Sequence, residues 1–220
     1  MDRQITEKEI RQELDAARKK AVGGRDLDAC MDICYADVLL AESNLRENRG
    51  LWEIAGLTRE LISQADFLEG YDHLLNDLYS VCSRMADCLS GHPRLMVQLL
   101  RLERQILYRI ESLSGHELGI TEDLGREISD LEYNIYVADR GEFDLLKADG
   151  RHLKYDPVEW TAKWEEVIDE VDKAVEKELE GMPRGMGFCF AFWSARSAEL
   201  AKHGVEWRSP GVMNPGVMFD

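Results

Sequence analysis

Residues 93–115, PRLMVQLLRLERQILYRIESLSG, give the clearest indication of the fold. Proline opens the segment, where a helix needs no amide donor, and glycine closes it, where a helix commonly ends. Between them, apolar side chains recur at spacings of three and four residues: Leu95, Leu99, Leu102, Ile106 and Ile110. This spacing places them along one face of a helix. The segment therefore predicts an amphipathic helix that packs against other helices.

The same pattern continues on both sides of this segment. Thr6 and Glu9 form a capping box, and Asp26 is placed to cap a second helix. Asp156 followed by proline indicates another helix start, and we expect that helix to cover about 157–180. Short turns separate these segments, which makes sequential helices antiparallel. The sequence predicts an all-α protein of about eight helices, arranged as an antiparallel helical bundle or an array of helical hairpins.

Two segments depart from the helical pattern. Asp149-Gly150 is a typical hairpin turn, so residues 145–155 form either a short β-hairpin or an irregular loop. Residues 205–220 contain proline and glycine and no helical period, so we expect an extended C-terminal tail. We expect a single helical domain over 1–220. Within it, 1–141 forms the main helical array and 142–220 forms a C-terminal helical subdomain with a packed tail.

The composition argues against several classes of protein. The chain has 27 Lys and Arg against 43 Asp and Glu, a formal net charge of -16. Nucleic acids and anionic membranes attract basic surfaces, so neither is an expected partner. No apolar run approaches the ~20 residues that span a bilayer, and residues 1–7 lack the apolar core of a signal peptide. We expect a cytoplasmic protein with reduced cysteines.

The last forty residues differ from the rest of the chain. Residues 181–220 carry four bases and three acids, so the remaining residues hold the excess of negative charge. The segment is also dense in aromatic side chains: Phe188, Phe190, Phe192, Trp193, Trp207 and Phe219. Because so much apolar surface is costly to expose, we expect residues 205–219 to fold back into a groove between helices. The alternative is that they dock on a partner or on a second copy of the chain.

Polar and aromatic residues of this segment are the candidate binding residues: Arg184, Trp193, His203, Trp207, Arg208 and Asn214. Arginine beside tryptophan, as at Trp207 and Arg208, is a common element of anion or carboxylate sites. The alternative is structural, with Arg208 paired to a carboxylate of the protein body and Trp207 filling the core.

Two pairs of acidic residues form a candidate metal site. Glu127 and Asp130 are three residues apart, as are Glu166 and Asp169, so each pair shares a helix face and suits Mg²⁺. In this spacing alone, the chain resembles the all-helical nucleotide pyrophosphohydrolases, which implies a magnesium-dependent hydrolase of a nucleotide-like substrate. The same residues also fit solvated acidic helix faces.

The function that these patterns favour is non-enzymatic. No common catalytic motif occurs in the sequence, and no cofactor is expected. We expect a helical protein that binds a protein partner, or assembles with itself as a homodimer, through a groove near its aromatic C-terminal segment. One alternative is the small helical hydrolase with Mg²⁺. Another is an acidic inhibitor or immunity-type protein for a basic partner, which rests on the net charge.

Overall fold

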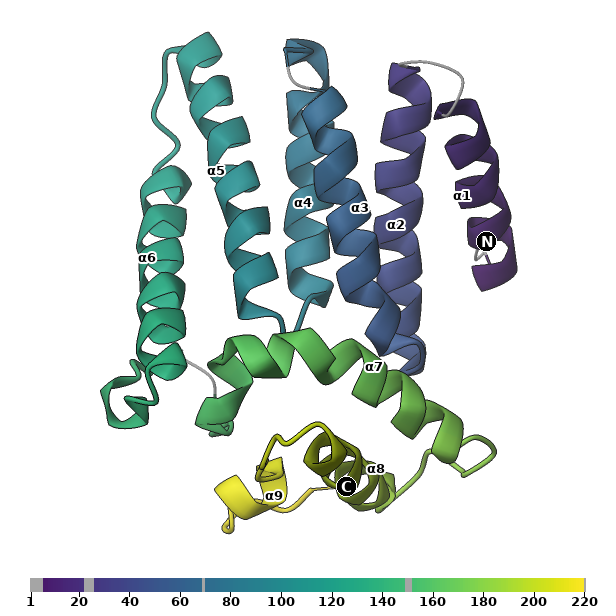
Figure 1. Ribbon diagram of the computed structural model, residues 1–220. Coiled ribbons are helices and arrows are strands. Elements are labelled where there is room, and N and C mark those ends of the chain that lie inside the picture. Colours follow the sequence, from purple (N-terminus) through teal and green to yellow (C-terminus); the bar gives the residue numbers. More distant parts are fainter. Residues whose placement is uncertain (1–5, 22–25, 69, 149–151, 220) are drawn as a thin grey trace. The chain divides into compact units, whose positions relative to one another are not determined.

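The computed structural model describes residues 6–21, 26–68, 70–148 and 152–219, and Figure 1 shows its ribbon. These residues contain nine α-helices and no strand, which confirms the all-α prediction. The helices are α1 (Glu7–Ala21), α2 (Leu27–Glu47), α3 (Ile54–Phe67), α4 (Leu75–Cys88), α5 (Pro93–Ser114), α6 (Ile120–Asp139), α7 (Ala162–Glu178), α8 (Phe188–Lys202) and α9 (Pro210–Met213). None of the helices in the described ranges is long and apolar enough to cross a bilayer.

The chain divides into two compact units. The N-terminal unit comprises residues 1–90 and 95–128, and the C-terminal unit comprises residues 91–94 and 129–220. The division falls within α6, so this helix contributes its first part to one unit and its second part to the other. Each unit has its own cluster of buried hydrophobic side chains.

The first two helices of the N-terminal unit begin where the sequence predicts. The backbone N–H of Thr6 donates to the Glu9 carboxylate over 2.9 Å, and the N–H of Glu9 donates to the Thr6 hydroxyl over 3.3 Å. Asp26 accepts from the N–H of Ala29 and caps α2. Consecutive helices from α1 to α5 run in alternating directions, and α2 packs against α1, α3 and α4 (Figure 1). The antiparallel arrangement is thereby confirmed for this unit.

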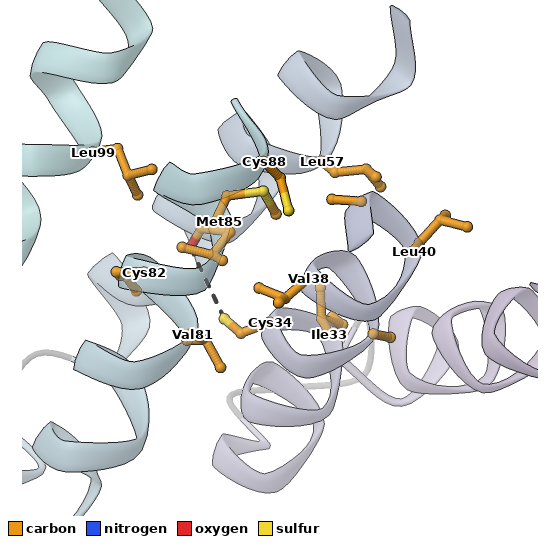
Figure 2. Close-up of a cluster of buried hydrophobic side chains, with 14 of the residues drawn as sticks. Ile33, Cys34, Val38, Leu40, Leu57, Val81, Cys82, Met85, Cys88 and Leu99 are labelled. Atoms are coloured by element: carbon orange, nitrogen blue, oxygen red, sulfur yellow. Dashed lines mark hydrogen bonds between the residues drawn. The ribbon is translucent and has the colours of Figure 1, made fainter. Parts of the chain in front are cut away.

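The core of the N-terminal unit is built from small and medium side chains of α1 to α5. Figure 2 shows Val38 on α2, Val81 and Met85 on α4, and Leu99 on α5, all of which are fully buried. Four cysteines are also buried in this core: Cys30, Cys34, Cys82 and Cys88. Burial raises the pKa of the Cys88 thiol to about 11, and the thiols of this core therefore pack as small apolar groups.

The C-terminal unit is centred on a helical hairpin. The chain enters it through a 3₁₀ helix, η4 (Pro157–Trp160), which Asp156 caps as predicted. The prediction of one continuous helix over 157–180 is wrong, because Thr161 adopts an extended conformation, with φ −79° and ψ 153°. Its side chain accepts from the N–H of Trp164 and starts α7 anew. The buried faces of α7 and α8 then meet around Trp164 and Leu200.

Two other expectations differ from the structure. Leu145 lies in a 3₁₀ helix, η3 (Phe143–Leu145), and no strand occurs at the described positions of 145–155, so a β-hairpin is not formed there. The Asp149-Gly150 turn itself lies outside the described residues. The C-terminal segment is not extended throughout, because Ser209 caps the short helix α9 with Pro210 in its first turn.

Replacing Leu99 by alanine will destabilise the N-terminal unit by about 2–5 kcal/mol, because the side chain is fully buried and its loss leaves a cavity. The matched control is Leu113→Ala on the same helix, where the side chain is 54% exposed and the expected loss is within about 0.5 kcal/mol. Urea unfolding followed by circular dichroism measures both. Equal losses would contradict the assigned face of α5.

Candidate functional site

Trp207 anchors the C-terminal segment to the α7–α8 hairpin. Its ring lies 6.1 Å from that of Trp164, and both side chains are buried. The indole N–H of Trp207 donates to the Glu159 carboxylate over 2.7 Å. Burial raises the pKa of Glu159, although this hydrogen bond opposes the shift. The location of Trp207 is that of a core residue, with its one polar atom satisfied within the unit.

Asp156 holds the next residue of the segment. Its Oδ2 accepts from the backbone N–H of Arg208 over 2.7 Å and from the Arg208 Nε over 2.9 Å. Its Oδ1 accepts from the N–H of Val158 over 3.2 Å, which is the cap of η4. One buried carboxylate therefore caps the start of η4 and fixes the segment to it. The guanidinium that the Trp-Arg pattern offered for an external anion lies against Asp156.

Asn214 fixes the segment at a second point. Its side-chain amide accepts from the N–H of Lys154 and donates to the carbonyl of Lys154, each over 2.9 Å. The same NH₂ group donates to the Pro210 carbonyl over 2.9 Å. Because the amide satisfies both backbone groups of one residue, it replaces the pairing that a neighbouring strand would supply. With Asp156, it holds the segment in contact with its own chain.

Arg196 occupies the centre of the aromatic cluster. Its guanidinium carbon lies 5.3 Å from the Trp164 ring, 5.4 Å from the Phe192 ring and 5.5 Å from the Trp207 ring. Its Nε donates to the Asp172 carboxylate over 2.7 Å. Arginine planes stack favourably on aromatic faces when they are partly desolvated. This charge is therefore part of the packing between α7, α8 and the C-terminal segment.

Trp193 organises the outer side of the same region. Its ring meets Phe190 edge to face at 5.4 Å between centroids and Phe219 at 5.0 Å. The chain passes close beside it at Gly211, where a Cβ would lie 3.2 Å from the Trp193 ring, so a larger residue there requires the ring to shift. Trp193 thus connects α8 to α9 and to the last residues of the segment.

Trp193 contacts the half-exposed Phe190 and lies beside two stretches of the chain, at Gly211 and Phe219, whose neighbouring residues carry exposed apolar side chains. We define the apolar surface by the Trp193 cluster and its neighbours along the chain: Phe190, Trp193, Val212, Val217, Met218 and Phe219. Phe190 is 54% exposed and Met218 is 94% exposed. Met186, in the loop before α8, is 92% exposed. Large apolar side chains that gather at one surface mark interaction sites more often than isolated ones do.

The other two predicted binding residues lie at opposite ends of α8. Arg184 precedes the helix, donates to Glu176 over 3.1 Å and stacks over Phe188 at 5.1 Å. His203 follows the helix at its C-cap and is partly buried. The six predicted binding residues therefore do not converge on one pocket: Trp207, Arg208 and Asn214 fix the segment, and Trp193 faces the apolar surface.

The four predicted metal ligands are solvent-exposed or interact with a basic side chain. Glu127 and Asp130 are exposed on α6, and Asp130 accepts from the Lys147 ammonium over 2.6 Å. Glu166 is exposed on α7, and Asp169 Oδ1 lies 2.9 Å from the buried His92 Nε2. Within the described part of the chain, no three His, Cys, Asp or Glu side chains are grouped so as to hold a metal ion.

Sequence reasoning missed two buried acids in the N-terminal unit. Asp37 on α2 is fully buried, and Glu103 on α5 is nearly so. Burial raises the pKa of Glu103 to about 7, and the charges of Glu127 and Asp87 add to the shift. The available signal was periodicity: Glu103 follows Leu99 by four residues and so falls on the apolar stripe.

Asp37 belongs to a small charged cluster. Burial raises its pKa to about 8, the nearby Glu60 carboxylate raises it further, and Arg18 opposes the shift. As two carboxylates, Asp37 and Glu60 form no hydrogen bond, but a protonated Asp37 is placed to donate to Glu60. Arg18 Nε donates to Glu60 over 2.8 Å. The cluster thus brings together charged side chains of α1, α2 and α3.

The cluster predicts a pH-dependent stability. The pKa of Asp37 is raised on folding, so its stabilisation is full below about pH 4 and is lost as pH rises through about 8. Asp37→Asn keeps a neutral donor at every pH, so between about pH 4 and about pH 8 its free energy of unfolding should fall by roughly 5 kcal/mol less than that of the wild type. Asp32→Asn, exposed on the same helix, is the control. Thermal unfolding at a series of pH values measures it, and parallel profiles for Asp37→Asn and wild type would contradict the assignment.

Removing the Asp156 carboxylate will release the C-terminal segment. Asp156→Ala should cost about 2 kcal/mol, because the N–H groups of Val158 and Arg208 lose their acceptor. Arg208→Ala retains the backbone bond from residue 208 to Asp156 and removes only a guanidinium whose side chain is 57% exposed, so it should cost less. Limited proteolysis within residues 205–219 and denaturant unfolding report both. Faster cleavage in Arg208→Ala than in Asp156→Ala would reverse the assigned roles.

Comparison with known proteins identifies no relative of this chain. No family model, no curated protein sequence and no solved structure matches the chain. The function is therefore argued from the geometry of the chain itself.

Proposed function

We propose that this protein is a non-enzymatic helical protein that binds other protein chains through the apolar surface around Trp193. The observation that carries the proposal is the start of α8. Residues 188–193, FCFAFW, are apolar on every face of the helix, yet none of the six is fully buried and Phe190 is 54% exposed. A helix segment that is apolar all round is normally covered. Binding of a protein would supply that cover.

The C-terminal segment, which carries part of the apolar surface, is held in place by buried contacts. Trp207, Asp156 and Asn214 hold the C-terminal segment against its own unit. The segment in turn positions Phe219 against Trp193. A surface held in advance loses less conformational entropy on binding than a free tail does. This arrangement supports a docking surface that exists before the partner arrives.

The side chains of the surface have the chemistry of binding hot spots. Trp193 lies at the centre with aromatic neighbours on two sides, and tryptophan is among the residues most enriched at such positions. Met218, and Met186 in the neighbouring loop, are unbranched and almost fully exposed, so they can adapt to the shape of a partner. These features support binding by apolar contact rather than chemistry on a small substrate.

A photo-crosslinking residue at position 190 should yield a protein adduct of discrete mass in an extract of the native cells. The same residue at Tyr136, which is exposed in the same unit, is the control and should give no such adduct. Adding Met218→Glu to the position-190 variant should remove the adduct, because a charge then lies in the apolar contact. The proposal fails if positions 190 and 136 give the same products, or if Met218→Glu leaves them unchanged.

A further inference from the structure

We infer that Glu103 on α5 makes the packing of the N-terminal unit sensitive to pH near neutrality, because ionisation of its buried carboxyl group opens α5 locally to water. Glu103 belongs to the N-terminal unit, whereas Trp193 and the apolar surface belong to the C-terminal unit. The pH-sensitive contact and the proposed binding of a protein can therefore be tested separately.

Glu103 lies on the buried face of α5. It follows Leu99 by one helical turn and precedes Ile106 by three residues, and both of these side chains are in the hydrophobic core. Glu103 itself is only 3% exposed, and its Oε1 accepts no hydrogen bond from any described residue. A buried carboxylate without a donor is costly, so the packed form of α5 favours the protonated acid.

The ionisable groups of the neighbouring helices do not compensate a negative charge at this position. Burial raises the pKa of Glu103 to about 7, and the negative charges of Glu127 on α6 and Asp87 on α4 add to the shift. Both of these acids are exposed. The buried Cys82 thiol of α4 is also near enough for the charge of Glu103 to raise its pKa. None of these three groups can carry a positive charge.

The direction of the pH effect follows from the location of the proton. When α5 opens, Glu103 meets water and regains its ordinary pKa of 4.5, whereas the packed form keeps the proton up to about pH 7. The packed form therefore binds the proton more tightly than the opened form does. The stabilisation that the proton provides is complete below about pH 4.5 and is lost as pH rises through about 7. Opening of α5 becomes easier over the same range.

Hydrogen–deuterium exchange of the full chain, followed by mass spectrometry between about pH 5.5 and about pH 8.5, tests this opening. Glu103→Gln is neutral at every pH, so comparing it with the wild type at each pH removes the intrinsic dependence of exchange on pH. We expect the ratio of α5 exchange rates, wild type over Glu103→Gln, to rise at least about tenfold across this range. Asp32→Asn, which removes an exposed acid of α2, should leave the wild-type profile unchanged.

A second variant tests the neighbouring acids without altering the core. Asp87→Asn combined with Glu127→Gln removes two exposed negative charges, so Glu103 should lose its proton at a lower pH than in the wild type. The pH-dependent rise in α5 exchange should then begin at a lower pH. Because both substitutions are at exposed positions, this variant keeps the inference testable even if Glu103→Gln fails to fold.

The amide groups of α7, in the C-terminal unit, are the internal reference and should show no such rise. A constant ratio of wild type to Glu103→Gln across the pH range would overturn the inference. An equal rise in α7 would also overturn it, since the opening would then not be local to α5. An unchanged α5 profile after removal of the charges at positions 87 and 127 would show that these acids do not act on Glu103, which again contradicts the inference.

Discussion

The packing of the C-terminal unit depends on the hydrogen bonds that the buried Asp156 carboxylate accepts. It caps η4, accepts from the backbone of Arg208 and so fixes where the last part of the chain begins to pack. Trp207, one residue earlier, is then placed against Trp164 with its N–H on Glu159. Ordering a chain end costs conformational entropy, which opposes the contact between Trp207 and Trp164. The hydrogen bonds of the segment to Asp156 and from Asn214 to Lys154 offset that cost.

This packing has a consequence for function. Polar side chains of the segment bond within the chain, Arg208 to Asp156 and Asn214 to Lys154. What the packing leaves outside is the apolar surface around Trp193. The segment thus forms hydrogen bonds within its own chain while side chains such as Phe190 and Met218 stay exposed, which supports the proposed binding of a protein.

The N-terminal unit shows a different constraint. Its buried residues include two carboxylic acids, Asp37 and Glu103, and burial raises the pKa of each carboxyl group well above its ordinary value. Such groups cost stability when they are charged, so they make this unit most stable at acidic to neutral pH. Arg18 on α1 and Glu60 on α3 interact with Asp37 on α2, so ionisation of Asp37 affects the contact between three helices.

Much of the fold follows from local patterns in the sequence. The spacing of Leu99 and Ile106 and the caps at Thr6 and Asp26 predict the helices because hydrogen bonding and apolar periodicity act over a few residues. The break at Thr161 was missed, because the Asp156-Pro157 start is equally compatible with a single turn and with a long helix.

The site depended on contacts that are distant in sequence. Nothing local pairs Asp156 with Arg208 or Lys154 with Asn214, since these residues are 52 and 60 positions apart. The sequence alone shows that the C-terminal segment is rich in aromatic side chains. Because exposing so much apolar surface to water is costly, it also predicts that the segment packs on its own chain. Which aromatic residues are buried, as Trp207 is, and which remain outside, as Phe190 does, was decided only by tertiary packing, because one helix face can cover only part of the apolar area.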